Sequence, residues 1–84
     1  MTRDQIAEQY GEELLFLDPP YFDGAIIGVV HQFMHPTVCY DTNKVINILM
    51  EHDGMTEDEA YEYFDYNILG AWTGEHTPSF LESP

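Results

Sequence analysis

Positive charge is the scarcest property of this sequence. Among its 84 residues, lysine and arginine together number 2, whereas aspartate and glutamate together number 16, which gives a formal net charge of −14 at pH 7. A charge of this sign and size repels nucleic acid and anionic membranes, so neither is expected as a direct partner. The chain is also too short for two domains of ordinary size. We therefore expect one small acidic domain that spans residues 1–84.

Cysteine and long hydrophobic runs are almost as scarce. Cys39 is the single cysteine, so no intramolecular disulfide can form, which suits a reducing compartment. The longest apolar run, Ala25 to Val30, has six residues, whereas a bilayer requires about 20. The opening MTRDQIAEQYG resembles neither a secretory signal nor a transit peptide. These features predict a cytoplasmic protein, located in the host cytoplasm if a phage encodes it.

Apolar and aromatic side chains are, by contrast, abundant. Hydrophobic residues make up 44% of the chain and aromatic residues 14%. Acidic disordered tails lack the apolar surface that offsets the entropy of an ordered chain, so this composition predicts a folded protein. The expected fold class is α+β, with a small antiparallel β-sheet packed against two consecutive helices.

The β-branched residues gather in two segments. Ala25 to Phe33 is apolar on both alternating faces, which predicts the central strand of the sheet, covered on both sides. Met34-His35-Pro36 breaks this segment, and Thr37 to Tyr40 resumes the pattern. We therefore expect an antiparallel hairpin as the basis of the sheet.

Helical periodicity follows the hairpin. Asp41 is suited to cap a helix, and Gly54 is suited to the left-handed position after one. Between them, aliphatic side chains recur on one side at Val45, Ile46, Ile48 and Leu49. The pattern predicts a first helix from Thr42 to Asp53.

The start of a second helix has a clear capping signal in the sequence. Thr56 and Glu59 match a capping box, in which two side chains satisfy each other's free backbone amides. This signal predicts a helix from Thr56 to Leu69 that ends at Gly70. Its inner stripe is expected to be Ala60, Tyr63 or Phe64, Asn67 or Ile68, and Ala71.

The two ends of the chain are less regular. Residues 1–13 predict a short N-terminal helix with Ile6 and Tyr10 on one face, followed by a buried connector at Leu14 to Leu17. Residues 73–84 contain a glycine and two prolines, which predicts a loop-like tail with room for one short docked strand.

One short motif points to an enzyme. Asp18-Pro19-Pro20-Tyr21 is identical to the D-P-P-Y motif of adenine amino-methyltransferases. Those enzymes need a cofactor domain with a glycine-rich turn and a basic surface for nucleic acid, and this chain has neither. We interpret the segment as a turn that delivers Tyr21 and Phe22 to the core, and we expect no catalytic residues.

The histidines and Cys39 suggest a metal site only at first sight. His31, His35 and Cys39 are four positions apart, and His52 and His76 follow. That spacing brings ligands together on a helix, whereas this segment predicts a strand and a turn. We therefore expect neither a metal nor another cofactor, and a small metal-binding protein is a secondary alternative.

The carboxylates of the second helix form the candidate binding site. Asp58, Glu62 and Asp65 share its outer side, and the two cations of the chain are too few to relieve most of the repulsion among its carboxylates. A ladder of carboxylates resembles a phosphate backbone, and tyrosines add anchoring area. The predicted partner-binding residues are Asp53, Glu57, Asp58, Glu59, Tyr61, Glu62, Asp65 and Tyr66. In the plainer interpretation the acidity serves solubility, with Tyr63 and Phe64 in the core.

Three segments resemble a widespread family of small acidic proteins encoded by phages, prophages and bacteria. The segments are Asp18 to Val29, Tyr40 to Met50 and Gly54 to Phe80, and the most specific matches are Glu62-Tyr63-Phe64, Asn67, Gly70-Ala71-Trp72, Gly74 and Thr77-Pro78. The resemblance implies a phage or mobile-element setting, in which small acidic folds often inhibit host machinery. It implies no specific activity, and Asn67, Trp72 and Thr77 suit a structural role as well as a functional one.

These observations lead to one functional prediction and one main alternative. The prediction is a non-enzymatic, phage-type acidic inhibitor that occupies a basic, nucleic-acid-binding site on a host protein such as a nuclease or a defence complex. The alternative is a housekeeping or structural module, a homodimer in which the second helix packs against its own copy.

Overall fold

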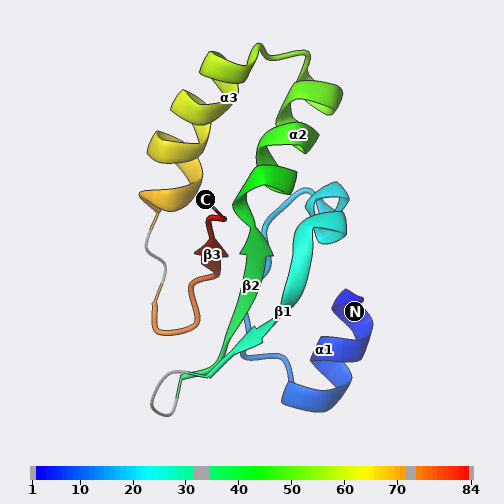
Figure 1. The fold of residues 1–84 in the computed structure, drawn as a ribbon. Helices are drawn as coiled ribbons and strands as arrows, with labels where there is room; N and C mark the ends of the chain where they lie inside the picture. The colour runs from blue at the N-terminus through cyan, green and yellow to red at the C-terminus, as the bar shows by residue number, and fades with distance from the viewer. Residues whose placement is uncertain (1, 32–34, 72–73, 84) are drawn as a thin grey trace.

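Three short strands form one sheet, and helices lie at both ends of it (Figure 1). The computed structural model describes residues 2–31, 35–71 and 74–83. In chain order the elements are α1 (Arg3–Tyr10), the 3-10 helix η1 (Pro20–Ala25), β1 (Ile26–Val30), β2 (Thr37–Asp41), α2 (Thr42–Asp53), α3 (Glu57–Tyr63), the π-helix η2 (Phe64–Leu69) and β3 (Ser79–Leu81). The arrangement confirms the α+β class.

The sheet is mixed rather than antiparallel, with the strand order β1-β2-β3. β1 and β2 form the expected antiparallel hairpin, with Ile26 opposite Tyr40 and Val30 opposite Thr37. β3 pairs with β2 in parallel, with Phe80 beside Tyr40. The prediction that the sheet contains only antiparallel strands is therefore wrong, because the tail supplies a third strand.

β2, not the Ala25–Phe33 segment, is the central strand. Val38, Cys39 and Tyr40 are buried in β2, whereas Ile27 and Val30 of β1 are 48% and 39% exposed. The prediction failed because an apolar run is compatible with burial on both faces but does not say how many neighbours the strand has. Residues 32–34, which include the predicted strand end Phe33, lie outside the described ranges.

α2 has the predicted bounds, and its two caps explain them. The Asp41 carboxylate accepts a hydrogen bond from the Lys44 backbone N–H at 3.2 Å, and Gly54 has a φ of 66°. A left-handed residue ends a helix, and glycine adopts that conformation without a Cβ clash. Val45 and Leu49 are fully buried, so α2 carries much of the core.

α3 begins as predicted and then changes geometry. Thr56 and Glu59 form the capping box, but after Tyr63 the helix continues as the π-helix η2 to Leu69. Ala60 and Phe64 are buried, and Ile68 packs against the core. The expected inner position of Ala71 is wrong because the helix ends before it and the residue is exposed.

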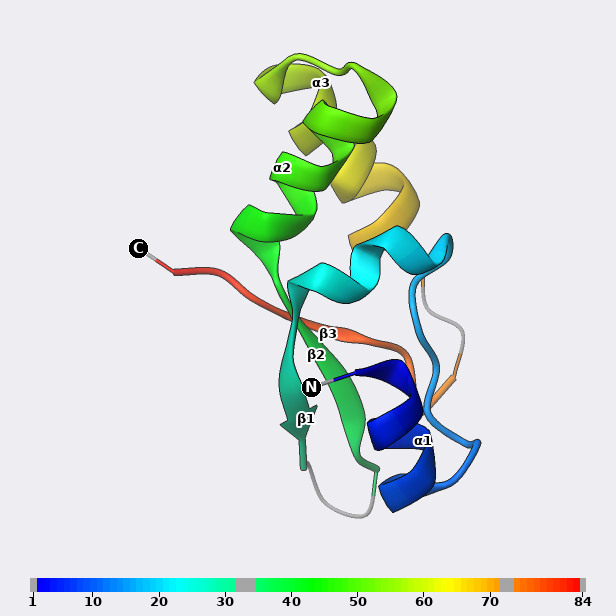
Figure 2. The same ribbon diagram turned by 90° about the vertical axis from the view of Figure 1, so that its right-hand side faces the viewer.

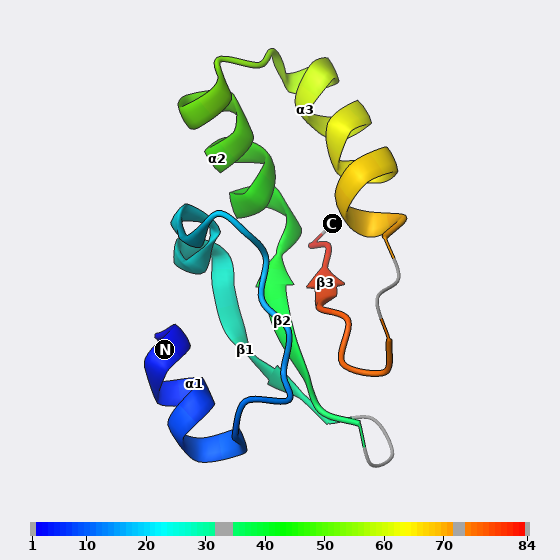
Figure 3. The same cartoon turned by 180° about the vertical axis from the view of Figure 1, so that it is seen from behind.

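The N-terminal segment forms α1, which is shorter than the predicted helix over residues 1–13. A capping box between Thr2 and Gln5 starts it, and Gly11, with a φ of 82°, follows its last residue. Ile6 is fully buried, and the connector that follows places Leu14 in the same core. Figure 3 shows this connector crossing the back of the molecule toward η1.

The C-terminal tail is part of the fold. The Phe80 ring packs edge-on against Phe64 at a centroid distance of 5.1 Å and lies 5.9 Å from Tyr40. The Thr37 hydroxyl donates a hydrogen bond to the Ser79 hydroxyl at 3.0 Å, next to the strand pairing. The tail predicted over residues 73–84 therefore contains β3, the one short docked strand for which the prediction left room.

Candidate functional site

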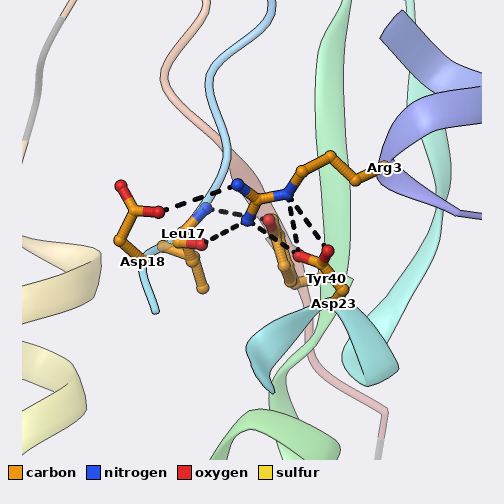
Figure 4. A network of polar contacts seen from close by, with 5 residues as sticks. All are labelled: Arg3, Leu17, Asp18, Asp23 and Tyr40. Carbon is orange, nitrogen blue, oxygen red and sulfur yellow. Dashed lines mark hydrogen bonds and ion pairs between the residues drawn. The ribbon is translucent and has the colours of Figure 1, made fainter. Parts of the chain in front are cut away.

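One of the two cations of the chain is used inside the fold (Figure 4). The Arg3 guanidinium donates hydrogen bonds to the Asp23 carboxylate at 2.9 and 3.0 Å and to the Leu17 carbonyl at 2.9 Å. It also lies 3.7 Å from the Asp18 carboxylate and 4.7 Å from the centroid of the Phe16 ring. The hydrogen bonds to Asp23 raise the pKa of Arg3 above its usual value. Arg3 therefore ties α1, the connector and η1 together.

Tyr40 holds the same connector from the sheet side. The Leu17 backbone N–H donates a hydrogen bond to the Tyr40 hydroxyl oxygen at 2.8 Å, and the Tyr40 side chain is fully buried. Burial raises the pKa of Tyr40 to about 12, although the hydrogen bond from Leu17 opposes the shift. A polar group buried this deeply needs its partner, so the path of the connector is fixed.

The carboxylates of α3 and η2 have no counter-charge among the residues that the structure describes. We name this surface the acidic face, and it consists of Glu57, Asp58, Glu59, Glu62 and Asp65, all exposed. None of them forms an ion pair with a described residue. Lys44, the second cation, is exposed on α2 and forms no ion pair within the described ranges either.

The acidic face costs the helix stability. Asp58 and Glu62 are four positions apart, and like charges at that spacing repel by a few tenths of a kcal/mol. Glu57 and Asp58 lie in the first turn of α3, where the helix dipole favours them, but Glu62 and Asp65 lie beyond it. The outer charges are therefore not explained by the needs of the helix.

Glu59 has a structural task within the acidic face. Its carboxylate accepts a hydrogen bond from the Thr56 backbone N–H at 2.9 Å, and its own N–H donates to the Thr56 hydroxyl. The hydrogen bonds from the Thr56 backbone and side chain lower the pKa of Glu59. Glu59 thus starts the helix while it adds charge to the surface.

Exposed tyrosines accompany the acidic face. Tyr66 is 79% exposed, Tyr61 36% and Tyr63 41%. A shallow hollow of about 330 Å³ lies among Met55, Glu59, Glu62, Tyr63, Tyr66 and Asn67. Of the two residues predicted for the inner stripe, Phe64 takes the buried position, so the plainer interpretation with both Tyr63 and Phe64 in the core is wrong for Tyr63. Tyr61 and Tyr66 are exposed, as an interface requires.

Asp53, the last residue of α2, lines a groove that sequence reasoning missed, whereas the other predicted residues belong to α3 and η2. The groove has a volume of about 390 Å³ and is lined by residues 15–19, η1, Asp53, the adjoining parts of α3 and η2, and the segment before β3. Figures 1 and 2 place η1 beside α2, so segments distant in sequence meet here. The only sequence signal was the aromatic segment around the two prolines.

Tyr21 is fixed at the wall of this groove. Its ring stacks on His52 with centroids 4.3 Å apart and an interplanar angle of 5°. Burial raises the pKa of Tyr21, and the Asp53 carboxylate and Tyr63 add to the shift. Tyr21, Asp53 and Tyr63 all line the groove, so the phenol and the carboxylate share this surface.

The D-P-P-Y segment has the structural role expected for it. Pro19 and Pro20 start η1, the Asp18-Pro19 peptide is cis, and Phe22 is buried. Tyr21 is only partly buried and lines the groove, so of the two residues expected in the core only Phe22 is fully placed there.

The histidines and Cys39 do not gather into one cluster. His35 and His76 meet edge-on with ring centroids 6.1 Å apart, but His31 contacts Tyr10 and His52 stacks on Tyr21. His31 lies 3.4 Å from the Tyr10 hydroxyl, His35 pairs with Glu75 at 3.2 Å, and His76 accompanies Glu13 at 3.8 Å. Cys39 is buried in β2. Across residues 2–31, 35–71 and 74–83, no three His, Cys, Asp or Glu side chains are grouped so as to hold a metal ion.

Comparison with known proteins leaves the family resemblance a prediction. Among its matching residues, Asn67 donates a side-chain hydrogen bond to the Tyr63 carbonyl and Thr77 to the Gly74 carbonyl, while Trp72 lies outside the described residues.

No helix in the described part of the chain combines the length and apolar character needed to cross a bilayer. No family model matches the sequence, and neither the curated proteins nor the solved structures provide a match.

Proposed function

We propose that this chain is a non-enzymatic binding protein whose acidic face occupies a basic site on another protein and thereby inhibits it. One observation carries the proposal: five exposed carboxylates on α3 and η2 have no cationic counterpart among the described residues and stand beside exposed tyrosines. The partner class is a nucleic-acid-binding host protein, such as a nuclease or defence complex, and the setting is a phage-type protein acting in the host cytoplasm.

The carboxylates and the tyrosines would contribute to binding in different ways. Unpaired carboxylates attract a basic surface over a distance and raise the association rate. Tyrosines then supply contact area with little loss of side-chain entropy, because they have few rotatable bonds. Tyr66, at 79% exposure, is the best placed anchor on the acidic face.

Self-association is a second candidate, supported by an apolar hollow beside the acidic face. Leu69 is 56% exposed, and together with Tyr61 and Phe80 it lines a small hollow of about 140 Å³. A homodimer through this surface would bring two strongly negative chains together. Salt would therefore strengthen such a dimer, whereas it would weaken a complex with a basic partner. Sedimentation at low and high salt separates the two cases.

Affinity capture from a host lysate tests the proposal with two matched variants. The first carries Asp58→Asn, Glu62→Gln and Asp65→Asn on the acidic face. The second carries Asp4→Asn, Glu8→Gln and Glu12→Gln, which are exposed on or after α1 and change the net charge equally. We expect the wild type and the α1 variant to capture a nucleic-acid-binding protein that elutes in high salt, and the acidic-face variant to lose it.

The same capture has an outcome that contradicts the proposal. Recovery of this chain alone, or equal capture by both variants, would remove the acidic face as the binding surface. Where a partner is recovered, added nucleic acid should compete with this protein for it, and failure to compete would exclude occupation of a nucleic-acid-binding site.

A further inference from the structure

The groove beside Asp53 suggests which part of a partner it receives. We propose that this groove binds an arginine side chain of the basic partner, between the Asp53 carboxylate and the aromatic rings of Tyr21 and Tyr63. The inference rests on the proposed function, and it assigns a specific pocket to a surface otherwise defined only by charge.

The chain already contains a site of this kind, filled by its own arginine. The Arg3 guanidinium is hydrogen-bonded to the Asp23 carboxylate and lies 4.7 Å from the Phe16 ring centroid. An arginine gains both a bidentate hydrogen bond and a cation–π contact from such a pair of groups. The groove offers the same combination of carboxylate and aromatic ring, and none of the described residues that line it is a cation.

The Asp53 carboxylate is available for a ligand. It forms no hydrogen bond or ion pair with any residue in the described ranges. Asp18, the other carboxylate on the groove wall, is 83% exposed and only 3.7 Å from an Arg3 nitrogen, so its charge is partly offset. The free charge in the groove therefore belongs to Asp53.

The walls of the groove are held in place before any ligand binds. The connector is fixed by Arg3 and by the Leu17 hydrogen bond to Tyr40, and the Tyr21 ring is fixed by its stack on His52. A preformed pocket spares the ligand the cost of ordering it. The volume of about 390 Å³ is within the range of ligand-binding pockets.

The groove is continuous with the proposed interface. Tyr63 and Asn67 line both the groove and the hollow on the acidic face. A partner seated on the acidic face would therefore have basic side chains at the mouth of the groove. This continuity favours a side chain of the same partner over an unrelated small molecule.

The chemistry of the lining selects arginine among possible occupants. An anion would face the Asp53 carboxylate and a net charge of −14. An apolar group would bury that carboxylate without a partner, which is costly. Lysine carries the right charge, but its compact ammonium is more strongly hydrated and does not stack on a ring as a guanidinium does.

Titration of the 84-residue chain with a blocked tripeptide, acetyl-Gly-Arg-Gly-amide, tests the inference by NMR. We expect backbone amide shifts at Asp53, Tyr63 and Asn67 and a dissociation constant in the millimolar range. The citrulline peptide, which has the shape of arginine without its charge, should bind at least tenfold more weakly, and the lysine peptide should also bind more weakly.

A matched pair of variants locates the binding. Asp53→Asn should lower the affinity for the arginine peptide about fivefold. Glu51→Gln, an exposed residue of the same helix outside the groove, removes the same charge and should change the affinity less than twofold. Equal effects of the two variants, equal binding of the citrulline peptide, or the absence of shifts at the groove would each overturn the inference.

The two proposals fail separately. If the arginine peptide binds the groove but lysate capture does not depend on the acidic face, the pocket stands and the proposed function falls. If capture depends on the acidic face but peptide shifts map only to Asp58, Glu62 and Asp65, the function stands and the pocket falls.

Discussion

Arg3 and Asp23, 20 positions apart in the chain, are joined by a guanidinium–carboxylate contact as short as 2.9 Å. The contact links α1 to η1 (Figure 4). η1 in turn contributes Tyr21 and Phe22 to the wall of the groove. The Arg3–Asp23 contact also removes one of two cations from the surface, which helps to explain why the acidic face stands uncompensated.

Replacement of Arg3 by glutamine should therefore destabilise the fold. Hydrogen bonds to a charged group contribute about 2 kcal/mol, and Arg3→Gln leaves Asp23 and the Leu17 carbonyl without their donor. The expected loss in the free energy of unfolding is about 2 kcal/mol, measured by urea denaturation. Lys44→Gln removes the same charge from an exposed site and should cost less than about 0.5 kcal/mol. Equal losses would mean that net charge, not the network, is responsible.

Tyr40→Phe should also destabilise the protein, because the Leu17 N–H loses its acceptor. An unsatisfied buried amide costs about 1–3 kcal/mol. Tyr66→Phe, at a site 79% exposed, is the control and should leave the urea midpoint unchanged.

The raised pKa of Tyr40 predicts that the protein loses stability at high pH. The pKa of Tyr40 is raised from 10.0 to about 12, so the unfolded chain releases this proton first. The unfolded state then binds fewer protons, and stability falls as the pH rises from about 10 toward 12. Thermal melts across this range should show a smaller decline for Tyr40→Phe than for the wild type, and identical slopes would count against the buried phenol.

The capping box predicts a local effect at α3 with the opposite pH dependence. Thr56→Ala should cost about 1 kcal/mol, whereas Thr56→Ser keeps the hydroxyl and should cost less. The pKa of Glu59 is lowered by hydrogen bonds from Thr56, so the stability it adds is present above the usual carboxyl value of 4.5 and is lost in acid. Hydrogen exchange at α3 should therefore accelerate as the pH is lowered through this range, after correction for intrinsic rates, and less so in Glu59→Gln.

Phe80→Ala tests whether the tail belongs to the fold. Its ring packs on Phe64 and near Tyr40, so truncation should cost about 2–3 kcal/mol and expose the β2 amides to exchange. Leu81→Ala, at a residue 51% exposed, should cost less than about 1 kcal/mol. A tail that is only loosely attached would show no difference between the two.

The helices could be predicted because their signals are local. Asp41 and Gly54 bound α2 through contacts within a few residues, and Thr56 with Glu59 starts α3 in the same way. The strand β3 has three residues and pairs with β2 across about 40 positions, as the Thr37–Ser79 hydrogen bond shows. No local pattern encodes such a pairing, so the mixed sheet and the central place of β2 could not be predicted.

The acidic face could be predicted from local sequence, whereas the groove could not. The acidic face lies on one helical segment, so its spacing was visible in the sequence. The groove is assembled from separate segments, and its walls depend on the Arg3 network and on the Tyr21–His52 stack. Only the folded chain brings Asp53 near Tyr21 and Tyr63.

The most direct test of the central claim is the affinity of a captured partner at several salt concentrations. We expect the wild type and the variant with Asp4, Glu8 and Glu12 neutralised to bind with equal affinity, and both affinities to fall steeply with salt. The variant with Asp58, Glu62 and Asp65 neutralised should bind at least tenfold more weakly, with a shallower salt dependence. Equal losses in both variants, or an affinity that salt leaves unchanged, would contradict the claim that the acidic face binds a basic site.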